Sequence, residues 1–141
     1  MIVVTAATGQ VGREVVRLLA DAAPVRAIVR DAAAADALPG AEVAVATFED
    51  ADALVAAMAG AETVFLAGRD SPDYAAQQGR AADAAARAGV RHVVKLSALG
   101  AAAGSPVGLM RDHNAVEGRL RASGMAWTFL RPHLYMQNLL R

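Results

Sequence analysis

The chain has 141 residues, of which 55% are hydrophobic, so it is long enough to bury one core and too short for two independent domains. It carries 14 basic and 14 acidic residues, and this balance provides no long-range field that would draw it to nucleic acid or an anionic membrane. Cysteine is absent, which excludes disulfides, thiolate nucleophiles and cysteine-ligated zinc. We therefore expect a single domain over residues 1–141 that meets its partners at a local site.

Apolar runs in the chain are short. Arg, Asp or Glu interrupts each of them before it reaches the roughly 20 residues that a membrane-spanning helix needs. Residues 1–5 are apolar, but they lack the basic region and the long apolar stretch of a signal peptide. The sequence therefore predicts a soluble, cytoplasmic protein without a membrane partner.

Short β-branched runs alternate along the chain with longer alanine-rich segments of helical period. Six strands are predicted, at Ile2–Thr5, Val25–Val29, Glu42–Ala46, Thr63–Leu66, His92–Leu96 and Trp127–Leu130. Most of them are apolar on both faces, as parallel strands buried between two layers of helices are. Right-handed crossovers between six such strands predict an α/β, doubly wound Rossmann fold, a parallel sheet of order 3-2-1-4-5-6 with helices on both faces.

The turn after the first strand has the composition of a dinucleotide-binding loop. It reads Thr5-Ala6-Ala7-Thr8-Gly9-Gln10-Val11-Gly12, and an amphipathic helix starts inside it. Such a loop needs a small residue where the backbone leaves the strand, a glycine beside the pyrophosphate and another where helix packs on strand. Gly9 and Gly12 take the last two roles, whereas Ala6 takes the first, where its Cβ would cost about 1 kcal/mol in a left-handed conformation. The alternative is a purely structural strand-to-helix turn.

The end of the second strand carries a signal for the type of dinucleotide. Arg30 stands where the adenosine ribose of a bound dinucleotide is expected, and a guanidinium there matches a 2′-phosphate in charge and fork geometry. The sequence therefore favours NADP(H) over NAD(H). Two alternatives remain, a solvated arginine that begins a loop and a role for the neighbouring Asp31 in binding NAD.

Residues 5–13, 25–30, 88–97 and 122–132 resemble the NmrA-like group of atypical short-chain dehydrogenases/reductases. This group includes NAD(P)H-dependent quinone reductases, isoflavone-reductase-like enzymes and non-catalytic redox-sensing regulators. The resemblance covers essentially the whole chain. Members of the group are usually longer, so the C-terminal portion that supplies much of their substrate pocket is expected to be absent here.

The resemblance also directs attention to a histidine. The Tyr-x-x-x-Lys pair of ordinary short-chain dehydrogenases is missing, since neither Tyr74 nor Tyr135 has a lysine four residues later. NmrA-like enzymes often place Lys or His eleven residues before the glycine of a Ser-Gly turn, a position that His113 occupies before Gly124. Helical spacing predicts that His113 points inward, where it could donate a proton near a nicotinamide. The alternative is a packed histidine that a backbone carbonyl satisfies.

Residues at the carboxyl ends of the later strands are expected to border the nicotinamide, because ligands bind at that edge of a doubly wound sheet. The expected cofactor-binding residues are Thr5, Ala6, Ala7, Thr8, Gly9, Gln10, Val11, Gly12, Arg30, Leu66, Ala67, Ser97 and Pro132, with His113 as the candidate catalytic residue. Lys95 lies within the fifth strand and is expected to be buried beside a partner or to snorkel. No metal site is expected.

Three functions remain open at this stage. The first is an NAD(P)H-dependent oxidoreductase that passes hydride to a quinone or another small carbonyl compound. The second is a non-catalytic module that senses the redox state of NAD(P), and the third is a truncated, inactive remnant. Apolar side chains around Leu134, Tyr135, Leu139 and Leu140 are expected to be exposed and to become buried by dimerisation. The sequence decides neither the substrate nor the oligomeric state.

Overall fold

The computed structural model of the protein describes residues 1–140, so Arg141 at the end of the expected domain lies outside the described residues. In chain order the elements are β1 (Ile2–Val4), α1 (Gln10–Leu19), β2 (Val25–Val29), η1 (Ala32–Ala37), β3 (Glu42–Val45), α2 (Ala51–Met58), β4 (Thr63–Leu66), α3 (Tyr74–Arg87), β5 (His92–Leu96), α4 (Gly108–Arg121), β6 (Ala126–Leu130) and η2 (Met136–Leu140). All six predicted strands are present. Strands β1 and β3 end one residue earlier than expected, and β6 begins one residue earlier.

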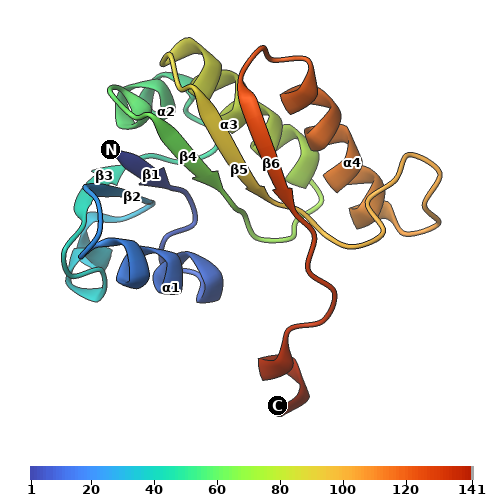
Figure 1. Ribbon diagram of the computed structural model, residues 1–141, viewed down its shortest axis with the longest axis horizontal. Helices are drawn as coiled ribbons and strands as arrows, with labels where there is room; N and C mark the ends of the chain where they lie inside the picture. Colours follow the sequence, from blue (N-terminus) through green and yellow to red (C-terminus); the bar gives the residue numbers. More distant parts are fainter. Residues whose placement is uncertain (141) are drawn as a thin grey trace.

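The sheet is parallel throughout, in the order β3-β2-β1-β4-β5-β6, which confirms the predicted topology (Figure 1). Its centre is β1, where Val4 is in register with Ala27 of β2 and with Phe65 of β4. The direction of chain progression reverses between β1 and β4. In an open α/β sheet such a switch point leaves a crevice beyond the carboxyl ends of the two strands.

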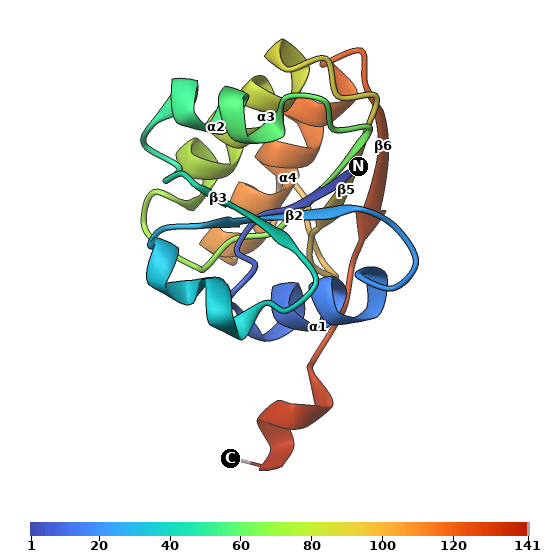
Figure 2. The same ribbon diagram turned by 90° about the vertical axis from the view of Figure 1, so that its left-hand side faces the viewer.

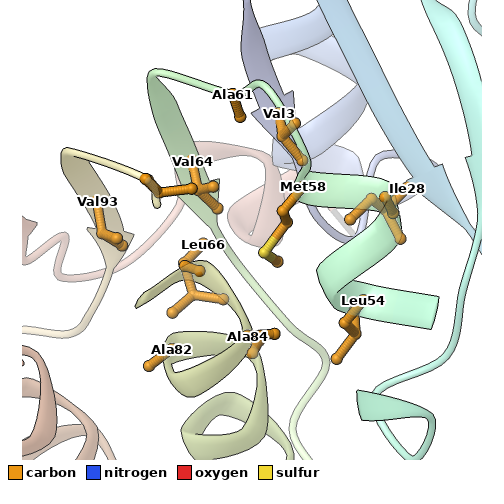
Figure 3. Packing of buried hydrophobic residues seen from close by; sticks show 14 of the residues in the cluster. Val3, Ile28, Leu54, Met58, Ala61, Val64, Leu66, Ala82, Ala84 and Val93 are labelled. Carbon is orange, nitrogen blue, oxygen red and sulfur yellow. The ribbon is translucent and has the colours of Figure 1, made fainter. Parts of the chain in front are cut away.

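Helices cover both faces of the sheet, as predicted. Figure 2 shows α1 and η1 on one side and α2, α3 and α4 on the other. Successive residues of a strand point to opposite faces, so Val3 packs toward α2 and α3 while Val4 packs toward α1. The larger cluster, on the side of α2 to α4, is shown in Figure 3, where Leu66 of β4 lies next to Ala82 and Ala84 of α3.

The last strand is less buried than its apolar sequence predicts. Trp127 is 44% exposed and Leu130 45% exposed. Because β6 is an edge strand, it has a neighbour on one side only, and α4 packs against only one of its faces. Trp127 stacks on Phe129 with ring centroids 4.4 Å apart, and the guanidinium of Arg121 covers both rings.

Two further segments frame the site. Residues 31–40 contain η1, where the Asp31 carboxylate accepts a hydrogen bond from the Ala33 backbone at 2.9 Å and caps the first turn. After β6 the chain runs away from the sheet and ends in η2 (Figures 1 and 2). Within residues 1–140, no helix combines the length and the apolar character needed to cross a membrane.

Candidate functional site

The turn between β1 and α1 contains a backbone conformation that alanine rarely adopts. Ala6 has φ +48°, and no other non-glycine residue among those described has a positive φ. Its carbonyl oxygen accepts a hydrogen bond from the Gly9 backbone at 2.9 Å, which closes the turn. Ala6, where the backbone leaves the strand, therefore adopts the left-handed conformation in which a Cβ is unfavourable.

Gly12 has the structural role expected of it. A Cβ added to Gly12 would lie 2.3 Å from the Ala6 carbonyl oxygen and 2.9 Å from the Ala7 Cα. These are backbone atoms that cannot swing aside, so only glycine lets α1 start this close to the turn. Gly9 is less constrained, since its Cβ would lie 3.2 Å from the same oxygen.

The N-terminus of α1 is open to a ligand. Its capping residue, Gly9, has no side chain, and the first turn contains no acidic residue. The first backbone N–H groups of a helix have no partner within the helix and carry a partial positive charge. This arrangement suits an anion such as a pyrophosphate.

Two hollows meet at this turn and form one crevice along the carboxyl ends of the strands. We call them the Arg30 hollow, of about 530 Å³, and the His113 hollow, of about 510 Å³. Both are lined by Ala6, Gly9, Arg69 and Asp70, so the turn is their common wall. The crevice thus offers two compartments that share the turn at the N-terminus of α1.

Most of the predicted site residues line this crevice. Ala6, Gly9, Gln10, Val11, Gly12, Ala67, Ser97, His113 and Pro132 line the His113 hollow, and Ala6, Thr8, Gly9 and Arg30 line the Arg30 hollow. The burial predicted for His113 is also found, because the residue is only 6% exposed.

Three predicted residues, Thr5, Ala7 and Leu66, do not line the crevice. The Thr5 hydroxyl donates to the Ala67 carbonyl at 2.7 Å and accepts from the Ala67 backbone N–H at 2.8 Å, so it fastens β1 to the end of β4. Ala7 is fully buried beneath the turn, and Leu66 points into the core of Figure 3. Their side chains support the walls of the crevice from behind.

Arg30 is exposed at the far end of its hollow. Among residues 1–140 it has no hydrogen-bonded or ion-paired partner, and Thr47 and Phe48 line the same hollow. Asp31, the alternative ligand for a ribose, does not line either hollow, and its carboxylate is engaged in capping η1. Of Arg30 and Asp31, therefore, it is Arg30 that places a charged group in the hollow.

Ser97 is held in place by a buried carboxylate. Its hydroxyl donates to Glu117 of α4 at 2.6 Å, and the Glu117 side chain is fully buried. Burial alone would raise the pKa of Glu117, but hydrogen bonds from Arg131, Ser97 and Arg121 outweigh it and lower the pKa. The carboxylate is therefore ionised at neutral pH and fixes this side of the His113 hollow.

Behind the hollow, Lys95 meets Tyr74. The Lys95 ammonium donates to the Tyr74 hydroxyl at 2.8 Å and to the Leu96 carbonyl at 2.7 Å. Nδ1 of His113 lies 3.3 Å from the Tyr74 hydroxyl and 3.4 Å from Lys95 Nζ. Lys95 is completely buried, as expected, and its partner is a hydroxyl rather than a carboxylate.

Tyr74 and Lys95 are 21 positions apart, so a pattern of tyrosine and lysine four residues apart does not describe them. One signal was present in the sequence. Lys95 is the only lysine of the chain, and it occupies a strand position that alternation with Val93 assigns to the buried face under α3 and α4. A charged residue at such a position is rarely without a buried partner.

Burial shifts the pKa values of this group. It lowers the pKa of Lys95 to about 7, against the opposing charges of Glu117 and Asp70. Burial and the neighbouring Lys95 lower the pKa of His113 to about 4, against the opposing charge of Glu117. Burial, with the charge of Asp70, raises the pKa of Tyr74. At neutral pH His113 is therefore neutral, Tyr74 is protonated and Lys95 is close to its titration point.

Other lining residues are not among the predicted site residues. Arg69 and Asp70 follow β4, Leu109 and Met110 come from the first turn of α4, and Tyr135 and Asn138 come from the segment after β6. Within residues 1–140, no three His, Asp or Glu side chains gather in a way that could hold a metal ion. The groups that the crevice presents to a ligand include the backbone N–H groups at the start of α1, the Arg30 guanidinium and the Tyr74 and His113 side chains, with Lys95 behind them.

Comparison with known proteins agrees with this geometry. A sequence family described as NAD(P)H-binding matches residues 6–138. An NAD(P)H azoreductase of Xenophilus azovorans is 41% identical to the chain, and quinone oxidoreductase 2 of Escherichia coli is 38% identical. Each alignment covers 99% of this chain but only 50% and 51% of the respective relative.

Solved structures give the same result. The NADPH-dependent quinone oxidoreductase of Escherichia coli, in complex with NADPH, superposes with a TM-score of 0.91 at 36% identity. The triphenylmethane reductase of Citrobacter sp., in complex with NADP(H), superposes with a TM-score of 0.90 at 31% identity. Both superpositions cover 99% of this chain and 51% of the other, so the chain spans about half the length of the relatives it matches.

Proposed function

The chain belongs to the NAD(P)H-binding family, with relatives in the NmrA-like group of short-chain dehydrogenases/reductases that its sequence resembles, and we propose that its crevice binds NADPH for hydride transfer to a small acceptor. The observation that carries this proposal is the position of the two hollows. They lie on either side of the α1 N-terminus and share the Ala6 turn as a wall. A dinucleotide has the same layout, with a pyrophosphate between two nucleoside halves.

The residues present fit such a ligand. The open backbone N–H groups at the start of α1 would hold the pyrophosphate, and the absence of a Cβ at Gly12 keeps that terminus next to the turn. The adenosine half would lie in the Arg30 hollow and the nicotinamide in the His113 hollow, beside Ser97 and Pro132. When bound, the nicotinamide supplies the hydride.

NADPH is the proposed form of the cofactor. Arg30 is exposed and free of protein partners among residues 1–140, whereas Asp31 is engaged in its cap. A guanidinium binds a phosphate through charge-assisted hydrogen bonds, often two at once. The 2′-phosphate of NADPH would provide such a partner, while the free hydroxyl of NADH would not.

The proposed acceptor is a quinone or another small carbonyl or azo compound. The names of the relatives refer to azo compounds and quinones, and the His113 hollow is walled by apolar side chains such as Leu109 and Met110 next to the polar His113 and Ser97. Such a site favours a flat apolar molecule with one polar end. The location in the cytoplasm and the dimer expected from the sequence remain predictions.

Calorimetry with NADPH and NADH tests the cofactor proposal. We expect tighter binding of NADPH by about one to two decades, and loss or reversal of this preference in Arg30→Glu. Arg91→Glu is the matched control, because Arg91 is an exposed arginine at the amino end of β5, paired with Glu62 on the surface. Equal affinities for the two cofactors in the unmodified protein would contradict the proposal.

Oxidation of NADPH in the presence of a quinone panel then tests the reaction. Turnover that depends on the quinone supports the oxidoreductase. Tight binding without turnover would instead favour a redox-sensing module. Light scattering on the same samples measures the mass and checks the expected dimer.

A further inference from the structure

The imidazole of His113 has two different surroundings. Its Nδ1 faces inward, 3.3 Å from the Tyr74 hydroxyl and 3.4 Å from Lys95 Nζ. Its Nε2 has no hydrogen-bond partner among residues 1–140 and is not among their buried, unpartnered side-chain atoms. Because His113 lines the His113 hollow, Nε2 is the nitrogen that a ligand in the hollow can reach.

Donors surround Nδ1 and thereby select a tautomer. The ammonium of Lys95 has no acceptor capacity, and the Tyr74 hydroxyl accepts from Lys95 at 2.8 Å, which directs its own proton toward Nδ1. Nδ1 must then act as the acceptor. A neutral imidazole with an acceptor at Nδ1 carries its proton on Nε2, where it points into the hollow.

We propose that Lys95 and Tyr74 hold His113 in the Nε2–H tautomer and pass a proton to Nδ1 as Nε2 gives up its own, so that His113 protonates the substrate oxygen as hydride is transferred. This inference rests on the proposed function of the crevice. His113 is the catalytic residue in it, since its Nε2 would touch the substrate. Lys95 and Tyr74 are positioning residues that act through His113.

The proton transfers balance. As hydride adds to the acceptor, the bond between Nε2 and its proton breaks and an O–H bond forms on the substrate oxygen. Nδ1 takes a proton from the Lys95 ammonium, directly or through the Tyr74 hydroxyl, and leaves Lys95 neutral. After the product leaves, a solvent proton enters at Nε2 and the proton on Nδ1 returns to Lys95. One hydride and one proton are consumed for each acceptor molecule.

The charges around the group favour this cycle. Burial brings the pKa of Lys95 to about 7, so the ammonium can release a proton near neutral pH. Glu117 of α4 and Asp70 of the loop after β4 face Lys95 and favour its charged form, which allows it to recover the proton. Burial raises the pKa of Tyr74, and the charge of Asp70 adds to this effect, followed by Tyr135 and Asp112, so the hydroxyl stays protonated.

Nitrogen NMR of the histidines tests the tautomer without cofactor or substrate. The chain has three histidines, and the His113 signal is identified by its loss in His113→Asn. We expect the Nε2–H tautomer in the unmodified protein near pH 6, where Lys95 is charged and His113 is neutral, and a mixture of tautomers in the double variant Tyr74→Phe/Lys95→Met, which removes both donors. Tyr135→Phe removes the other tyrosine hydroxyl of the same hollow and should leave the His113 signal unchanged.

The tautomer measurement can overturn the inference even if the oxidoreductase proposal holds, and it can support the inference even if turnover is absent. An Nδ1–H tautomer in the unmodified protein, or an unchanged tautomer in the double variant, would overturn it. Thermal melting shows whether each variant folds, and the two single variants, which keep one donor, are used if the double variant does not.

Kinetics test the resupply of the proton. With NADPH and 1,4-benzoquinone, His113→Asn should lower kcat by about two to four decades, the range of a positioned general acid. Lys95→Met should lower kcat by a smaller factor, leave the Kd of NADPH unchanged and remove the kcat transition near the pKa of Lys95, about 7. A Lys95→Met variant with the kcat and pH profile of the unmodified protein would refute the relay.

Discussion

The carbonyl oxygen of Ala6 lies 2.3 Å from the point that a Cβ on Gly12 would occupy. The two residues are six positions apart, and they meet because the chain turns sharply at Ala6 and comes back as the first turn of α1. This contact sets the distance between the helix terminus and the end of β1. We therefore expect it to control both the stability of the turn and the proposed affinity of the turn for a pyrophosphate.

Gly12→Ala should weaken both properties. The added methyl group must displace backbone, and forced packing of this kind typically costs about 1 to 3 kcal/mol. Because α1 would have to move away from the turn, we also expect at least a tenfold loss of NADPH affinity, or about 1.4 kcal/mol. Urea unfolding and calorimetry measure the two effects.

Gly118→Ala is the matched control for this substitution. Gly118 is an exposed glycine within α4, and its Cβ would have no atom within 4 Å. Alanine there should stabilise the protein by about 0.5 to 1 kcal/mol because it favours the helix. If the two substitutions shifted stability in the same direction, the proposed steric role of Gly12 would be wrong.

Ala6→Gly should stabilise the turn. Ala6 is held at φ +48°, and a Cβ in the left-handed region costs roughly 1 to 2 kcal/mol. Glycine also makes the unfolded chain more flexible, which offsets about 0.4 to 1 kcal/mol of the gain. We expect a net increase of about 0.5 to 1 kcal/mol in the free energy of unfolding, seen as a higher melting temperature.

Ala7→Gly provides the comparison. Ala7 is fully buried and does not have a positive φ, so glycine there gains nothing from strain and loses a buried methyl group. This variant should melt at a lower temperature than the unmodified protein. A fall in melting temperature for Ala6→Gly as well would show that position 6 stores no strain.

Glu117→Gln should destabilise the protein by about 3 kcal/mol. The substitution leaves Ser97, Arg121 and Arg131 without the charged acceptor that they share, and breaking a buried ion pair typically costs about 3 to 5 kcal/mol. The lower end of this range applies because the side chains of Arg121 and Arg131 are partly exposed. Glu62→Gln removes one exposed ion pair, with Arg91, and should cost less than about 1 kcal/mol. Similar losses in the two variants would contradict the role of Glu117.

The stability of the folded chain should rise with pH in a window set by Lys95. Its pKa is lowered from 10.5 to about 7 in the folded state. Below pH 7 the side chain is charged in both states, and folding bears the full penalty of burying it. Between pH 7 and pH 10.5, Lys95 of the unfolded chain keeps its proton, whereas Lys95 of the folded chain has released it. The free energy of unfolding therefore increases with pH across this range.

Lys95→Met should remove this increase. Each pKa unit corresponds to about 1.4 kcal/mol, so the variant should be more stable than the unmodified protein at pH 6, by an amount on the order of a few kcal/mol. The difference should shrink toward pH 10. Urea unfolding at intervals across this range measures it, and a difference that does not change with pH would rule out the shifted pKa.

The sequence by itself determined the layers and the turn of this protein. Strand order followed from six short β-branched runs and the handedness of crossovers, and the dinucleotide loop followed from Gly9 and Gly12 directly after the first strand. These features depend on neighbours in the chain, on local backbone conformation and on a periodicity of two or 3.6 residues. The strain at Ala6 could be predicted for the same reason.

The tertiary structure decided which side chains meet. Tyr74, Lys95 and His113 come from α3, β5 and α4, and their contacts depend on how two helices cross one face of the sheet, which no local pattern encodes. The same packing turned Leu66 inward, away from the crevice, and left Trp127 exposed on an edge strand. A sequence position at the carboxyl end of a strand indicates that a residue is near the site. Only the direction of its side chain, fixed by packing in three dimensions, decides whether it lines the site or supports it from behind.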